Sequence, residues 1–570
     1  MPPSKTKENS RFPHPFQADP LGTGWPELGL GLRSPRTLLE LKMCRLSAHI
    51  RQKPRWWEKM RDEAIRARWI REAKEQQAQL RPWERLTESM LNYVMNELEG
   101  YAKLRDPKTG IECGPYEGIY ISDTLIPQDV EVSLKTAVRS LEDVPDDEKD
   151  WHPGSDGRVL DLVHPSICPL IFHETWGTDD DGTLITFGSP DEKSLGVQEM
   201  FISERFQWLP SDFAVAADGA VSLMSPYINN IPPKHHDALV PVVERVMTHA
   251  IPLWERVLSA LRRGEHPDRV KRRDTPRNSY DADFPVACIW GDEGAHTPYG
   301  DSQEGDEDED ISSWLERKYG GSLVLPDAPA EYKDTFNEEL STSLTNTRIQ
   351  VIVKLANIVL TPEKPEYPGG IWHVEGMATE SIVSTFIYYY ESENIESCNL
   401  SFRMATCYPG YHEQDDSVCM TVLYGISRDD PCVQDIGSAE TKAGRCIAFP
   451  NIYQHRVSPF RLADPSKPGV RKILVFFLVD PTTMIWSTDN VPPQQLELVQ
   501  DTLTSEALNR SSRLALLPVE LLHRIARLVP GVKSRAEAEA IREELMEERS
   551  IMIESVNKEY FAREFNMCEH

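Results

Sequence analysis

Residues 367–375, Tyr-Pro-Gly-Gly-Ile-Trp-His-Val-Glu, contain the motif on which the fold prediction rests. The Pro-Gly-Gly run is typical of a turn, so the chain enters the motif from a loop. On an extended backbone, residues two apart point to the same face, so His373 and Glu375 can bind one ion together. The run that follows, residues 381–390, is β-branched and aromatic without a breaker, which predicts a strand.

Several more strands are predicted around this motif. They span residues 321–325, 348–360, 399–406, 418–426, 444–450 and 470–479. A β-barrel would bring His455, which follows the strand ending at residue 450, back to His373 and Glu375. Two imidazoles and one carboxylate on one side of a metal leave the opposite positions open, which is the ligand set of non-haem Fe(II) oxygenases. The sequence therefore predicts a metal site made by these three residues.

Arg471 opens the last predicted strand, so its side chain and that of Lys472 point to opposite faces. An inward Arg471 needs an anionic partner, because an unpaired buried cation costs several kcal/mol. Its guanidinium can bind a dicarboxylate end-on through a bidentate pair. The alternative is an outward Arg471 in a surface ion pair, with Lys472 on the inner face.

The His-x-Glu motif is followed by several strands, then by His455 and then by Arg471. With the motifs in this order, residues 345–485 resemble the Fe(II)- and 2-oxoglutarate-dependent dioxygenases. The resemblance implies a double-stranded β-helix core, a jelly-roll relative of the cupins. It also implies Fe(II) bound by the triad and 2-oxoglutarate anchored by Arg471. Over a longer span, including residues 160–166 and 372–376, the chain also resembles a fungal family of proteins with a large domain of unknown function.

Two residues depart from the commoner dioxygenase pattern. The carboxylate ligand is Glu375 rather than an aspartate, and the Arg-x-Ser pair of some branches reads Arg-Lys-Ile here. A second hydroxyl donor to the co-substrate must therefore come from elsewhere. By strand position, the candidates are Thr385, Tyr388 and Tyr424.

Composition limits the class of protein. The 570 residues suffice for two to four domains, and 40% hydrophobic with 27% charged residues is typical of a soluble globular protein. The net charge of −29 disfavours nucleic acid as the principal partner. No apolar run reaches the length of a membrane span and no signal-peptide core is visible, so we expect a cytoplasmic or nuclear protein with reduced thiols.

The predicted fold class is α+β, with helical regions on both sides of the β-helix core. We divide the chain into a disordered or wrapped segment (1–36), a helix-rich region with short strands (37–290), an acidic loop (291–312), the β-helix domain (313–490) and a helical extension (491–570).

The leading functional prediction is an Fe(II)- and 2-oxoglutarate-dependent oxygenase that hydroxylates or demethylates an unidentified protein or small molecule. Two alternatives stay open. One is a non-catalytic jelly-roll interaction protein, and the other is a cupin-like metalloenzyme that does not use 2-oxoglutarate. His164 is interpreted as structural rather than as a ligand, and the oligomeric state is left open.

Overall fold

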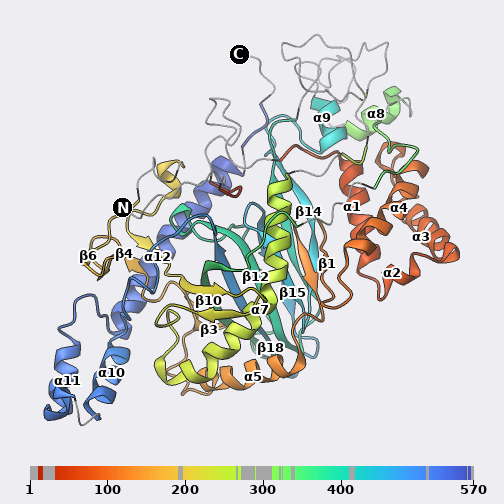
Figure 1. The fold of residues 1–570 in the computed structure, drawn as a ribbon. Coiled ribbons are helices and arrows are strands. Elements are labelled where there is room, and N and C mark those ends of the chain that lie inside the picture. The colour runs from red at the N-terminus through yellow and green to blue at the C-terminus, as the bar shows by residue number, and fades with distance from the viewer. Residues whose placement is uncertain are drawn as a thin grey trace.

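A computed structural model describes residues 11–16, 33–190, 195, 197–264, 268–270, 289, 311–319, 323, 325–334, 340–409, 417–508, 512–561 and 563–566. The chain combines helices with antiparallel sheets, which confirms the α+β class (Figure 1). The predicted acidic loop lies outside the described residues up to residue 310, and most of residues 1–36 and of the strand predicted at 321–325 lie outside them as well.

A nine-stranded antiparallel sheet forms the centre. Its strands are β1 (Glu112–Cys113), β2 (Tyr120–Ser122), β3 (Val159–Val163), β8 (Ser211–Val215), β9 (Val221–Leu223), β10 (Thr347–Leu360), β12 (Ile382–Glu393), β15 (Cys446–Pro450) and β18 (Gly469–Val479). Their order is β1-β2-β15-β12-β18-β10-β8-β9, and β3 also pairs with β10. We call this the main sheet.

A three-stranded sheet, here called the minor sheet, has the order β14-β13-β16. Its strands are β13 (Cys398–Ala405), β14 (Val433–Thr441) and β16 (Gln454–Val457). Three two-stranded pairs are also present among the described residues: β11 (Glu366–Tyr367) with β17 (Phe460–Arg461), β4 (Leu170–Ile171) with β7 (Phe206–Gln207), and β5 (Trp176–Thr178) with β6 (Leu184–Thr186).

The α-helices form groups around these sheets, with α1 to α4 on one side and α10 and α11 on the other (Figure 1). Their bounds are α1 (Leu38–Arg51), α2 (Trp56–Lys59), α3 (Glu63–Gln76), α4 (Glu88–Leu104), α5 (Gln128–Glu142), α7 (Pro233–Arg263), α8 (Ile311–Tyr319), α9 (Ser417–Tyr424), α10 (Leu496–Leu508), α11 (Val519–Ala526) and α12 (Arg535–Ser555). Among the described helices, none combines the length and the apolar character that crossing a membrane requires.

Most of the strands predicted in the core are confirmed. The predictions at 348–360, 381–390, 399–406, 444–450 and 470–479 correspond to β10, β12, β13, β15 and β18. The strand prediction at 418–426 is wrong, because residues 418–424 lie in helix α9. A short apolar run cannot be assigned by periodicity alone. Here Met420, Leu423 and Tyr424 are buried at helical spacing in a separate cluster that includes Trp314.

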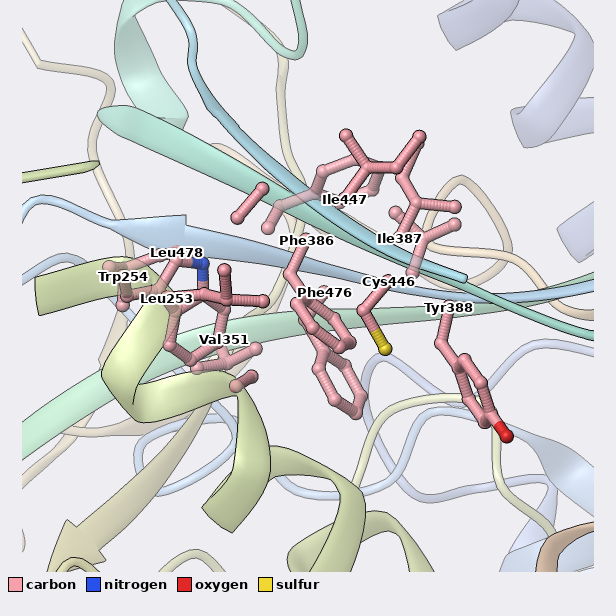
Figure 2. Packing of buried hydrophobic residues seen from close by; sticks show 14 of the residues in the cluster. Leu253, Trp254, Val351, Phe386, Ile387, Tyr388, Cys446, Ile447, Phe476 and Leu478 are labelled. Atoms are coloured by element: carbon pink, nitrogen blue, oxygen red, sulfur yellow. The ribbon is translucent and has the colours of Figure 1, made fainter. Parts of the chain in front are cut away.

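The two faces of the main sheet pack against different partners. On one face, Trp254 of α7 lies against Phe386 of β12 and Phe476 of β18, with ring centroids 6.2 and 6.3 Å apart (Figure 2). Ile387 and Ile447 point away from this layer in the same view. We call the face under α7 the outer face.

The other face, here called the inner face, looks toward the minor sheet. Strand β18 pairs with β10 without a register shift, so Arg471, Val475 and Phe477 share the inner face. Contact across the gap is direct, because the Arg471 guanidinium reaches the Cys398 sulfur of β13 at 3.1 Å. Side chains on the inner faces of both sheets therefore meet in one interior.

Helix α12 is fastened to the core by a buried ion pair. Arg549 Nη2 lies 2.6 Å from Glu380 Oε1, and the Glu380 side chain is fully buried. The two carboxylate oxygens also accept from the backbone N–H groups of Trp208 and Met377. The arginine in turn covers the Trp208 ring at 3.8 Å. Glu380 thus joins the C-terminal helix to the segment that follows the His-x-Glu motif.

We expect Arg549→Met to lower the free energy of unfolding by about 3–5 kcal/mol, because the Glu380 charge stays buried without its partner. Arg535→Met is the matched control on the same helix. Its ion pair with Glu539 is half exposed, so the loss should stay below about 1 kcal/mol. Urea unfolding followed by circular dichroism measures both, and equal midpoints for the two variants would contradict this role of Glu380.

Candidate metal centre

The structure brings His373, Glu375 and His455 together. Glu375 Oε1 lies 3.7 Å from His373 Nε2 and 3.2 Å from His455 Nε2. The two imidazole centroids are 4.4 Å apart, and one donor atom from each of the three residues falls within 4.8 Å of the others. Their side chains are 29%, 14% and 5% exposed, respectively, so solvent reaches the group from the His373 side.

The backbone sets this arrangement. His373 and His455 form an antiparallel bridge, in which each N–H donates to the carbonyl of the other residue, at 3.2 and 2.9 Å. Asn451 then fixes Glu375 by accepting from its N–H at 2.8 Å and donating to its carbonyl at 2.9 Å. The amide of Asn451 also donates to the Ile382 carbonyl, which ties the motif to β12. All three candidate ligands therefore sit on hydrogen-bonded backbone.

The ring nitrogens of the two histidines differ in their surroundings. His373 Nδ1 lies 2.8 Å from the Ile371 carbonyl, which requires a proton on Nδ1 and leaves the Nε2 lone pair free. This is the usual outer contact of a metal-ligating imidazole. His455 Nδ1 is buried and has no hydrogen-bond partner among the described residues.

The three groups shift one another's protonation. Burial disfavours the charge on Glu375, but its close contacts with His373 and His455 outweigh burial and hold its pKa well below the usual value. Burial also opposes the charged form of His373, yet the contact with Glu375 raises the pKa of that imidazole. The pKa of His455 is lowered by burial and by the nearby His373. One carboxylate and two imidazoles thus direct their donor atoms toward one common position.

Arg471 lies on the inner face, 1% exposed, and Lys472 lies on the outer face, where it pairs with Glu142 and Glu391. The Arg471 guanidinium stacks on the Phe460 ring at 4.1 Å and, within the part of the chain that the structure describes, donates only to Cys398. Its Nε and Nη2 groups are buried without a partner among the described residues. A cation left so poorly compensated in the interior calls for an anion.

Arg471 and the triad face the same interior. On β18, Phe477 points to the same side as Arg471, and it pairs with Thr385, which in turn pairs with Phe449 of β15. The Phe449 ring lies 4.8 Å from the His455 ring. Thr385 is thus on the inner face as well, and its hydroxyl is buried without a hydrogen-bond partner among the described residues.

The other two hydroxyl candidates do not join this group. Tyr388 lies on the outer face with Phe386 and Phe476 (Figure 2), and its ring is 6.2 Å from that of Tyr390. Tyr424 lies on α9, in the separate cluster described above, because the strand predicted for it is a helix.

Two residues near Arg471 were missed by the sequence reasoning. Tyr389 pairs with Ile473 on the inner face, and burial raises the pKa of its hydroxyl while the charge of Arg471 opposes the rise. Cys398 supplies the sulfur that accepts from Arg471. On a regular strand, residues 385 and 389 share a face and residue 388 points to the other face. This period alone predicts Tyr389, and not Tyr388, as the hydroxyl group on the side of Thr385. No sequence signal marked Cys398.

A second group of potential ligands, His152, Asp161 and His164, has the character of a hydrogen-bond network. His152 Nδ1 lies 2.7 Å from Asp161, and the Ser166 backbone N–H donates to His164 Nδ1. The proton of the neutral His164 ring is then on Nε2, which removes that nitrogen as a ligand. Asp161 and His164 line a cavity of about 410 Å³ that none of the triad residues lines.

Comparison with solved structures gives only weak similarity. The Fe(II)/α-ketoglutarate-dependent dioxygenase TqaL is 13% identical over 24% of this chain, with a TM-score of 0.15. A BsmA homologue from Methylobium petroleophilum is 9% identical over 64% of this chain and 89% of its own, with a TM-score of 0.25. IDO from Bacillus thuringiensis is 11% identical over 24% of this chain and 47% of its own, with a TM-score of 0.14.

These TM-scores are too low to carry an argument about fold or function. The chain spans 43% of the length of TqaL. No curated protein matches the sequence.

Comparison with protein-family models shows to which family the chain belongs. The model described as "protein of unknown function (DUF4246)" matches residues 88–502, and the model of the N-terminal DUF4246 domain matches residues 1–72. The first match alone covers well over half of the sequence. The chain therefore belongs to the DUF4246 family, whose function is unknown.

Proposed function

We propose that the two facing sheets form a double-stranded β-helix. The path of the chain supports this architecture, since it passes from the main sheet (β12) to the minor sheet (β13 and β14), back to the main sheet (β15), to the minor sheet (β16) and back again (β18). All of these strands pair antiparallel, and their inner faces enclose the triad and Arg471. A jelly roll built in this way uses such alternation to close its interior.

Within this framework, we propose an Fe(II)- and 2-oxoglutarate-dependent oxygenase that oxidises a C–H bond of its substrate. His373, Glu375 and His455 would hold the metal, and Arg471 would hold the distal carboxylate of 2-oxoglutarate. When bound, the metal and the co-substrate supply the oxidising chemistry that amino-acid side chains lack. The observation that carries the proposal is the buried Arg471 guanidinium, with two N–H groups unpaired among the described residues, in the interior that the triad also faces.

The donor chemistry fits both groups. Two imidazoles and a carboxylate suit divalent iron and leave positions open for further ligands. The contact of His373 Nδ1 with the Ile371 carbonyl leaves Nε2 as the ligand atom once the ring is neutral, and the lowered pKa of Glu375 keeps that donor anionic. The two unpaired N–H groups of Arg471 match a carboxylate that accepts two hydrogen bonds.

The remaining inner-face residues orient the co-substrate and exclude water. Thr385 and Tyr389 offer hydroxyl groups on the strand next to Arg471, in place of the serine that is absent after it. Val475, Ile387 and Phe449 provide apolar walls, which strengthen electrostatic contacts in the interior. The substrate would enter where His373 is exposed.

Formation of succinate from 2-oxoglutarate in the presence of Fe(II) and dioxygen tests the activity directly, because succinate is the product of the co-substrate in the proposed reaction. Metal binding without 2-oxoglutarate binding would instead favour a cupin-like metalloenzyme. Failure to bind either group would favour a non-catalytic interaction protein.

Glu375→Ala should weaken binding of Fe(II), or of Co(II) as an air-stable probe, by more than about 100-fold. Even loss of an outer contact of a metal ligand costs 10–100-fold, and this change removes the only anionic donor. Glu396→Ala is the control, because Glu396 is exposed and pairs with Arg461. Calorimetric titration measures both, and an unchanged affinity in Glu375→Ala would refute the triad.

Metal affinity should fall as pH decreases, because a protonated imidazole cannot bind a metal. The raised pKa of His373 in the metal-free protein means that proton competition begins above the usual histidine value of 6.5. Binding is therefore expected in full above the His373 pKa and lost as pH falls through it. Co(II) titrations between pH 5 and 8 measure this, and a constant affinity would exclude histidine ligands.

Arg471→Lys should weaken 2-oxoglutarate binding by about 1–3 kcal/mol, because the charge remains but the bidentate fork is lost. Lys472→Met is the control on the same strand, since Lys472 points to the outer face. The measurement is a 2-oxoglutarate titration of Co(II)-loaded protein. Equal affinities in the wild type and in Arg471→Ala would remove the reason to prefer this class over a cupin.

A further inference from the structure

Two arginines on neighbouring strands of the minor sheet lie over one tryptophan. The guanidinium carbons of Arg403 (β13) and Arg456 (β16) are 4.8 and 4.4 Å from the centre of the Trp372 ring. The two positive charges therefore share one aromatic side chain, and Arg456 is exposed to solvent.

This cluster lies on the side of the minor sheet that faces away from the metal centre. His455 pairs with Phe402 toward the interior, so the neighbouring Arg456 and Arg403 point the other way. Trp372 precedes His373 in the chain. The cluster is thus separate from the triad but built on the same strands.

Arg403 is held in place by amide groups. Its Nε donates to Gln454 Oε1 at 2.6 Å and its Nη2 donates to Asn557 Oδ1 at 3.1 Å. Asn557 also accepts from Gln454 at 2.7 Å and donates to the Trp372 carbonyl at 3.0 Å. It belongs to the π-helical turn η6 (Val556–Tyr560), a rare conformation that is often found at functional sites. The guanidinium is thereby oriented before any ligand arrives.

Neither guanidinium forms an ion pair with any described residue, although the protein carries 91 acidic residues and a net charge of −29. Asp435, which lies across the ladder from Arg403, is 3.7 Å from Arg45 instead. Partial burial and the adjacent Arg456 lower the pKa of Arg403 to about 10. Like charges packed in this way are unfavourable unless an anion offsets them.

We propose that Arg403, Arg456 and Trp372 form a binding site for a phosphate group. A phosphate monoester carries close to two negative charges at neutral pH, which matches the two guanidinium groups. Arginine binds phosphate oxygens through paired N–H donors, and Arg456 and the remaining amino group of Arg403 are available for this. The site does not depend on the proposed oxygenase chemistry.

Calorimetric titration of inorganic phosphate into metal-free protein tests the site, with phenyl phosphate as a second probe that can also stack on Trp372. Arg456→Gln and Arg403→Gln should each weaken phosphate binding at least about tenfold, the effect of one lost charged hydrogen bond. Arg456→Lys should fall between the wild type and Arg456→Gln, because it retains the charge without the fork. Since Arg456 is exposed, its variants should fold normally, which melting temperatures verify.

Two controls separate this cluster from other cations. Arg461→Gln removes an exposed arginine that is already paired with Glu396, and it should leave phosphate affinity unchanged. Arg471→Ala removes the interior cation, and phosphate binding should survive it. The proposal is overturned if phosphate does not saturate the wild type by about 10 mM, if Arg461→Gln weakens binding as much as Arg456→Gln, or if only Arg471→Ala abolishes it.

Discussion

The backbone bridge between His373 and His455 is the constraint on which the candidate centre depends. It joins a short segment after a turn to β16, segments that are far apart in the sequence. Neither segment holds the geometry alone, because a bridge of one residue pair has few hydrogen bonds. Asn451 adds the missing contacts by fixing Glu375 and reaching β12. The relative position of the three donors is therefore set by backbone and amide groups rather than by flexible side chains.

The interior also contains two opposite charges that do not neutralise each other. The Glu375 carboxylate is balanced by the two imidazoles, whereas the described residues offer Arg471 only a sulfur and an aromatic ring. The described contacts therefore leave the Arg471 charge poorly compensated, while the Glu375 charge is balanced by the imidazoles. In the function proposed above, a carboxylate would compensate Arg471. This difference between satisfied and unsatisfied groups carries more information about function than the weak similarity to solved structures.

Sequence reasoning succeeded where the two-residue period of a strand decides the outcome. His373 and Glu375, and the opposite directions of Arg471 and Lys472, follow from that period. The same period separates Thr385 from Tyr388 on β12, because residues three apart on a strand point to opposite faces. The strand prediction at residues 418–426 is wrong for another reason, because an apolar run of this length fits a helix and a strand equally well. The Arg403 and Arg456 cluster depends on contacts between distant strands, which no local pattern reveals.

The C-terminal segment is not a detachable appendage of the core. Asn557 binds the Trp372 carbonyl just before the His-x-Glu motif, and Arg549 binds Glu380 just after it. A protease cut or a premature stop codon that removed the C-terminal segment from α12 onward would therefore expose both flanks of the His-x-Glu segment at once. A shortened gene that keeps every strand of the β core would thus still encode a candidate site without two of its anchoring contacts.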